Sequence, residues 1–251
     1  MRVTVAAAAA AAVLTLGSAG CQTRPSNTVI VFAASSLTET FTALGDAFTD
    51  AGVVELSVGG SADLLTQLTH GAEADVFASA DIATMDKAVR AGLLDGPTHS
   101  FATNVLTIAV APGNPHQVNS FRDLARVSTA VCAIQVPCGA ALPGLQSRTG
   151  VQLRPISEES SVTDVLNKVT SGQADAGLVY LTDARATGDK VTAVEFPEAS
   201  SATNTYQVGV LKTARDAALA RRFVELVTGA TGRRVLGSAG FGEPVRLPSA
   251  S

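Results

Sequence analysis

Short runs of β-forming residues alternate with segments of helical periodicity along the chain, and this alternation constrains the fold more than any other feature. The first strand is predicted at Thr28–Phe32, followed by a helix in which Leu37, Phe41 and Leu44 share one face. Ser36 stands at the expected N-cap of that helix. Such an alternation is typical of α/β architecture with a largely parallel sheet.

The same pattern continues toward the end of the chain. Later strands are predicted at Val53–Val58, Asp75–Ser79, Thr129–Ile134, Val151–Ile156, Ala176–Tyr180, Val191–Phe196 and Tyr206–Leu211. Later helices are predicted after Ser61, over Ile82–Ala91, between Cys138 and Gly150, after Ser161, and over Thr213–Val227 and Thr231–Leu236. The start Ser161-Val162-Thr163-Asp164 matches a capping box with Asp in place of Glu. The apolar run Phe101–Ala111 is long enough to pass between two lobes.

Four strand-to-helix junctions carry hydroxyls or small residues where cationic side chains could be expected. They are Ala34-Ser35-Ser36-Leu37, Gly59-Gly60-Ser61-Ala62, Val136-Pro137-Cys138-Gly139 and Ser160-Ser161-Val162-Thr163. The first turn of a helix presents unpaired backbone N–H groups and a partial positive charge. Several such turns converging on one cleft predict an oxyanion site that needs neither Arg nor Lys.

The N-terminal segment has the order of a secretory signal. Arg2 precedes an apolar run, Val3–Leu16, and then come small residues that end at Cys21. The run is shorter than the ~18 residues expected of a membrane-spanning helix. The ending resembles a bacterial lipoprotein cleavage box, which implies a signal peptide over residues 1–20, acylation of Cys21 and a lipid-anchored tether over residues 21–28. A plain cleaved signal is the alternative.

Composition excludes two classes of protein. Hydrophobic residues make up 46% of the chain and charged residues only 16%, which favours a compact fold over disorder. The formal net charge is -4, and no basic stripe with interleaved aromatic residues is present. We therefore expect no binding of nucleic acid.

Three segments, in order and with compatible spacing, resemble the molybdate-binding proteins of bacterial ABC importers. They are Val31-Phe32-Ala33-Ala34-Ser35-Ser36-Leu37, Gly71–Asp81 and Gly177–Ala184. The resemblance implies a type II periplasmic-binding-protein fold, in which two α/β lobes joined by two crossover strands enclose a ligand cleft. Lobe I would comprise residues 29–104 and 205–248, and lobe II residues 105–204. It also implies an extracytoplasmic protein with no enzymatic activity.

The same resemblance implies a set of ligand-binding residues for molybdate or tungstate. Matched motif by motif, the set consists of the hydroxyls of Ser36 and Ser61, the backbone N–H groups of Cys138 and Val162, and the phenol of Tyr180. Cys138 stands where the family usually has Ala. Neighbouring residues with less certain roles are Ser35, Asp63, Ser161 and Asp183.

A structural explanation competes with each of these assignments. Ser36 and Ser61 could simply cap helices, Tyr180 could be a half-buried aromatic residue, and Val162 could belong to the core. Sulfate, phosphate or another small oxyanion remains an alternative ligand, and Asp63 or Asp164 could accept the proton of phosphate. A serine hydrolase using Ser61 is a weaker alternative, because the G-x-S-x-G motif fails at Asp63.

The remaining expectations concern cysteines and partners. Cys132 and Cys138 could form a disulfide in an oxidising compartment, and the sequence leaves pairing and free thiols open. No His lies near either Cys, so we expect neither a metal ion nor a cofactor. The resemblance implies a monomer that meets an ABC permease and its ATPase, held at the cell membrane through the N-terminal lipid.

Overall fold

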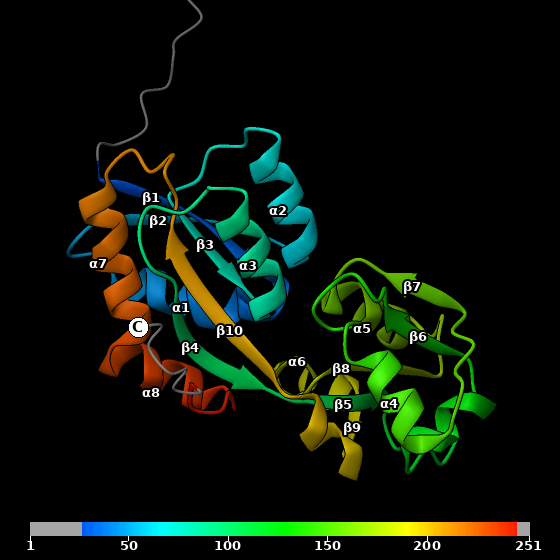
Figure 1. Cartoon of the computed structure of the whole chain (residues 1–251). Coiled ribbons are helices and arrows are strands. Elements are labelled where there is room, and N and C mark those ends of the chain that lie inside the picture. The colour runs from blue at the N-terminus through cyan, green and yellow to red at the C-terminus, as the bar shows by residue number, and fades with distance from the viewer. Residues whose placement is uncertain (1–26, 245–251) are drawn as a thin grey trace, which may run out of the picture.

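A computed structural model describes residues 27–244. The predictions for the signal peptide, Cys21 and most of the tether concern residues outside this range, as does the end of lobe I after residue 244. The described chain forms two α/β lobes that lie side by side (Figure 1). The strand β1 begins at Thr28, so this last residue of the predicted tether already belongs to the first lobe.

The first lobe is built on a five-stranded sheet in the order β2-β1-β3-β10-β4. Its strands are β1 (Thr28–Ala34), β2 (Val53–Gly59), β3 (Val76–Ser79), β4 (His99–Asn104) and β10 (Asn204–Val210). Its helices are α1 (Thr38–Ala47), α2 (Ser61–Thr69), α3 (Ile82–Arg90), α7 (Ala217–Thr228) and α8 (Ala230–Ser238). The C-terminal helices therefore return to the lobe in which the described chain begins (Figure 1).

The second lobe repeats this plan on a sheet in the order β7-β6-β8-β5-β9. Its strands are β5 (Leu106–Val110), β6 (Thr129–Cys132), β7 (Ser157–Glu159), β8 (Ala176–Tyr180) and β9 (Thr192–Val194). Its helices are α4 (Leu142–Thr149), α5 (Val162–Thr170) and α6 (Leu181–Ala186), and short 3-10 turns complete the connections.

Both sheets are mixed, which corrects the expectation of a largely parallel sheet. In the first lobe, β1 is parallel to β2 and β3, whereas β10 is antiparallel to β3 and β4. In the second lobe, β5 is antiparallel to β8 and β9. The antiparallel strands are those next to the two passages between lobes, where the chain changes sheet instead of completing a β-α-β unit.

Two passages of the chain connect the lobes. The predicted long run Phe101–Ala111 is divided at Val105 into β4 of one sheet and β5 of the other. At this division Asn104 donates from Nδ2 to Thr182 Oγ1 of α6 at 2.7 Å, and Leu181 N donates to Val105 O at 2.9 Å. The second passage leads into β10 at Asn204.

An aromatic cluster fills the core of the first lobe. Phe41 of α1 and Phe48, which follows the last residue of α1, pack against Phe223 of α7 with centroid distances of 5.9 and 5.4 Å. The ring centroid of Phe101 in β4 lies 5.8 Å from the ring centroid of Phe41. The predicted apolar face of α1 is confirmed, because Leu37, Phe41 and Leu44 are fully buried.

Two local predictions were wrong. Ser36 is not the N-cap of α1, because Ser35–Leu37 forms a separate 3-10 turn and Leu37 precedes the helix. No strand forms over residues 151–156, where Pro155 lacks an N–H and Leu153 N donates instead to Gln146 Oε1 at 2.7 Å. The strand starts later, as β7, and pairs with β6.

Within residues 27–244, every helix is too short or too polar to span a bilayer.

Replacing Phe223 by Ala should lower the free energy of unfolding by about 3–5 kcal/mol, because it empties the centre of the aromatic cluster. Phe223→Leu, which keeps most of the volume, should cost less. Denaturant unfolding of both variants measures the difference, and a loss below about 1 kcal/mol for Phe223→Ala would contradict this description of the core.

Candidate functional site

The four predicted strand-to-helix junctions meet at one cavity between the lobes. Its lining residues are Ala34, Ser35, Ser36, Gly59, Gly60, Ser61, Ala80, Pro137, Cys138, Ser160, Ser161, Val162 and Tyr180. The cavity has a volume of about 10 Å³, roughly the room of one water molecule. The walls are therefore close together, and a larger molecule could enter only when the lobes separate.

Ser61 lies at the start of α2, where Gly60 is the N-cap. Its side chain is 2% exposed, and its Oγ accepts a hydrogen bond from Ala80 N at 3.1 Å. Because a backbone N–H can only donate, the hydroxyl hydrogen of Ser61 is left for another acceptor. The Ser61 hydroxyl does not cap α2, which removes the main structural alternative for this residue.

Ser36 lies in the 3-10 turn between β1 and α1. Its Oγ is 2.8 Å from Tyr206 Oη of β10, and this hydrogen bond joins residues that are 170 positions apart in the sequence. No side-chain hydrogen bond caps either the turn or α1, so Ser36 does not act as a helix cap.

The second lobe contributes backbone groups. Val162 is the first residue of α5, a position at which the N–H has no partner within the helix. The helix starts with the predicted cap: Ser161 Oγ accepts from Asp164 N at 3.1 Å, and the Ser161 hydroxyl also lies 2.6 Å from Asp164 Oδ2. The Ser161 side chain thus serves as the N-cap of α5.

Cys138 lies in a tight turn that is joined to the end of β6 by a disulfide with Cys132, whose Cα atoms are 5.6 Å apart. Gly139 permits this turn, because a methyl group there would lie 2.1 Å from Ala133 O. Within the described chain, the Cys138 N–H makes no backbone hydrogen bond, whereas Gly139 N and Ala140 N both donate to Val136 O. The turn therefore leaves one N–H available beside the cavity.

Tyr180 ends β8 and precedes α6. Its phenol is buried, and Asn204 Nδ2 donates to Tyr180 Oη at 2.7 Å. Burial, followed by the proximity of Tyr206, raises the pKa of the Tyr180 phenol well above its ordinary value. The group therefore keeps its hydrogen at neutral pH and can act as a donor.

Two residues that were not predicted from the sequence, Asn204 and Tyr206, contact the predicted site residues Tyr180 and Ser36. Both lie on β10, and Asn204 Nδ2 is also 3.2 Å from Ala80 O in one lobe and Pro137 O in the other. Tyr206 was recognised only as the start of a predicted strand. Local sequence carries no signal for these roles, because their partners are brought together by the fold.

The cavity lining contains no charged side chain among the residues that the structure describes. Asp63 and Asp164, the two candidate acceptors for a proton of phosphate, are both outside this lining. The predicted site residues Ser36, Ser61, Cys138, Val162 and Tyr180 are all within it. In the described chain no group of three or more His, Cys, Asp or Glu is placed to hold a metal ion.

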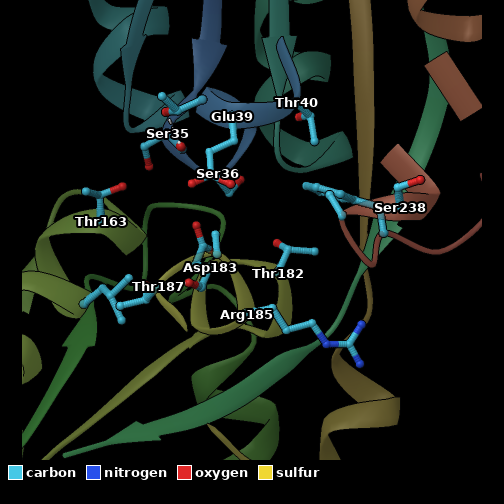
Figure 2. A pocket seen from close by; sticks show the side chains of 15 residues that line it. Ser35, Ser36, Glu39, Thr40, Thr163, Thr182, Asp183, Arg185, Thr187 and Ser238 are labelled. Carbon is cyan, nitrogen blue, oxygen red and sulfur yellow. Dashed lines mark hydrogen bonds between the residues drawn. The ribbon is translucent and has the colours of Figure 1, made fainter. Parts of the chain in front are cut away.

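A second cavity of about 460 Å³ lies between the lobes and shares Ser35 and Ser36 with the first. Figure 2 shows Asp183 of α6 across the gap from Ser36 and Glu39, with the Arg185 guanidinium directed away from it. Oδ2 of Asp183 is buried and has no hydrogen-bond partner among the described residues. Asp183 thus lies beside the first cavity and not in it.

Burial raises the pKa of the Asp183 carboxyl to about 7. The negative charge of Glu39 contributes to this rise, and hydrogen bonds from the backbone N–H groups of Asp183 and Tyr180 only partly oppose it. The folded protein therefore binds this proton more tightly than the unfolded chain does.

Comparisons with known proteins agree with the two-lobed architecture. Residues 29–242 match the family described as bacterial extracellular solute-binding protein. The molybdate-binding protein ModA of Mycobacterium tuberculosis is 51% identical over 227 residues, covering 88% of this chain and 87% of that protein. The molybdate-binding protein ModA of Escherichia coli is 29% identical over 247 residues, covering 92% and 95% of the two chains.

Among solved structures, the periplasmic molybdate-binding protein of Azotobacter vinelandii superposes with a TM-score of 0.73 at 24% identity, covering 86% of this chain and 100% of that chain. At this identity the likeness shows the fold, and it confirms the predicted type II periplasmic-binding-protein fold. The matched family consists of solute-binding proteins, which confirms the expectation of a binding function and contradicts a serine hydrolase built on Ser61.

Gly60→Ala should keep the lobes from closing fully, because a methyl group at Gly60 would lie 2.2 Å from Ser160 O of the other lobe. We expect a longer distance between spin labels on α2 and α5 than in the wild type. Gly59→Ala is the matched control, since its methyl group would make an ordinary contact of 3.5 Å with Leu64. Equal distances in both variants would contradict the close approach.

Asp183→Asn should stabilise the protein more at pH 8 than at pH 5. Because the pKa of Asp183 is raised to about 7 on folding, the wild type loses stability as pH rises from about 4 to 7, and the amide avoids this loss. Thermal unfolding at the two pH values measures the effect. Asp189→Asn, at an exposed position, is the control, and a pH-independent difference for Asp183→Asn would contradict the prediction.

Proposed function

The chain belongs to the family of bacterial extracellular solute-binding proteins, and from this premise we propose that it captures molybdate between its lobes and delivers it to an ABC transporter. The observation that carries the proposal is the cavity in which Ser36, Ser61, Cys138, Val162 and Tyr180 come together. A curated relative that is 51% identical and bears the name of a molybdate-binding protein supports the choice of ligand.

The proposed site offers neutral donors of two kinds. They are the hydroxyls of Ser36, Ser61 and Tyr180 and the backbone N–H groups of Cys138 and Val162, five residues that line the same cavity, and no cationic side chain lines this described cavity. Molybdate is a fully ionised tetrahedral dianion near pH 7, so its four oxygens only accept hydrogen bonds. Charge-assisted hydrogen bonds of about 1.5–3 kcal/mol each, together with the positive end of α5, would stabilise the dianion.

The same donors would discriminate among anions. Phosphate retains a proton near neutral pH, and that proton needs an acceptor, which a shell made only of donors does not provide. Sulfate carries the same charge as molybdate but is smaller, so a cleft closed around molybdate would leave its hydrogen bonds long. Tungstate is nearly the same size as molybdate, and we propose that it binds comparably.

Capture would proceed by closure of the two lobes without any chemical step. The anion shifts the equilibrium toward the closed form because it contacts both lobes only in that form. We propose that the closed protein, as a monomer, then docks on a permease driven by an ATPase. Acylation of Cys21, which lies outside the described residues, would keep the protein at the outer face of the cell membrane as a lipoprotein.

Isothermal calorimetry with molybdate, tungstate, sulfate and phosphate tests the proposal. We expect tight one-to-one binding of the two larger anions and weak binding of sulfate and phosphate. Ligand at about 1,000 times its dissociation constant should also stabilise the fold by ~4 kcal/mol, seen as a rise in melting temperature.

The double variant Ser36→Ala with Ser61→Ala is the control for the location of the site. It should abolish the molybdate-induced rise in melting temperature while leaving the ligand-free protein folded. Tight binding of sulfate or phosphate by the wild type would show that this anion, and not molybdate, is the ligand of the site. An unchanged rise in the double variant would show that these serines do not contact the anion.

A further inference from the structure

Each hydroxyl of the proposed site is within hydrogen-bond distance of another group of the protein. Ala80 N donates to Ser61 Oγ at 3.1 Å, and Asn204 Nδ2 donates to Tyr180 Oη at 2.7 Å. Ser36 Oγ lies 2.8 Å from Tyr206 Oη. A hydroxyl has one hydrogen to give, so the direction of these bonds decides where that hydrogen points.

The direction of the bond at Tyr180 is fixed by chemistry. An amide nitrogen donates and does not accept, so the Tyr180 oxygen must be the acceptor. The orientation of the Asn204 amide is itself determined, because its nitrogen lies 3.2 Å from two carbonyl oxygens, those of Ala80 and Pro137. A reversed amide would place an oxygen against both carbonyls.

Either hydroxyl can be the donor in the bond between Ser36 and Tyr206. Asn104 Nδ2 lies 3.4 Å from Tyr206 Oη, and its nitrogen can only donate. Tyr206 Oη therefore accepts from Asn104, which occupies one of its two lone pairs and leaves its hydrogen available for Ser36 Oγ. The Tyr206 ring is fixed by Phe101 and Phe241, at centroid distances of 6.1 and 5.4 Å, so the phenol has little freedom to turn away.

We propose that Asn204 and Tyr206 are positioning residues that donate to the hydroxyl oxygens of Tyr180 and Ser36, so that these hydroxyls turn their hydrogens toward the cavity. With Ala80 N acting in the same way on Ser61, all three hydroxyls present a hydrogen to the cavity. This inference rests on the proposed function and adds to it the residues that reject protonated anions. Both residues lie on β10, a strand that links the lobes.

Sulfate and phosphate provide the probe, because they are similar in size and differ in the proton that phosphate retains. Competition calorimetry against bound molybdate gives the dissociation constant of each anion for the wild type and for Tyr206→Phe. This variant keeps the ring and removes one oxygen, which frees the Ser36 hydroxyl to turn and to accept the proton of phosphate.

The expected result has two parts. Tyr206→Phe should weaken molybdate binding by about threefold to tenfold, the loss of one oriented hydrogen bond, and should shift the phosphate-to-sulfate preference toward phosphate by about tenfold. Asn204→Leu should shift the preference in the same direction through Tyr180. Thr107→Val is the matched control: it removes a buried hydroxyl that bonds Val194 O of β9, and it should change only the melting temperature.

The outcomes separate this inference from the proposed function. An unchanged phosphate-to-sulfate preference in Tyr206→Phe, with molybdate binding retained, overturns the positioning roles and leaves molybdate capture standing. Failure of the wild-type protein to bind any of the three anions contradicts the proposed function and the inference together. If Asn204→Leu does not fold, the phosphate-to-sulfate preference of Tyr206→Phe alone tests the inference.

Discussion

A buried dianion must find hydrogen-bond donors for all its oxygens, and the proposed site depends on meeting that requirement. Its donors come from places where a strand ends and a helix or turn begins, because the first N–H groups of a helix have no partner within the helix. Gly60 and Gly139 permit the close packing that such junctions need, since a methyl group at either would collide with a carbonyl oxygen. The resulting cavity is small, uncharged and shared between lobes.

The strand β10 contacts residues of the cavity wall in both lobes. Asn204 contacts Tyr180, Ala80 and Pro137, and Tyr206 contacts Ser36, so two residues of one strand reach the walls contributed by both lobes. A movement of the lobes about the connecting strands would therefore change the orientation of the hydroxyls together with the width of the cavity. Asp183, which lines the second cavity, adds a carboxyl whose proton is bound more tightly in the folded protein.

The sequence was sufficient where the determining interactions are local. The capping motif of Ser161 and Asp164, the apolar face of α1 and the strand β8 ending at Tyr180 were all predicted from patterns a few residues long. The prediction failed where distant parts of the chain decide. The Gln146 side chain holds Leu153 out of a strand, and the 170-residue separation of Ser36 from Tyr206 concealed the role of β10. The resemblance to a known family identified the candidate site residues, but it did not identify Asn204 and Tyr206, which contact them.

In the proposed site, uncharged donors hold the anion without help from a cation. Anomalous scattering at the molybdenum absorption edge, from a crystal grown with molybdate, locates the metal directly. We expect one strong peak in the cavity between Ser36, Ser61 and Tyr180, with no Lys or Arg side chain in contact with the anion. A peak beside Arg185 in the neighbouring cavity, or none between the lobes, would contradict this proposal.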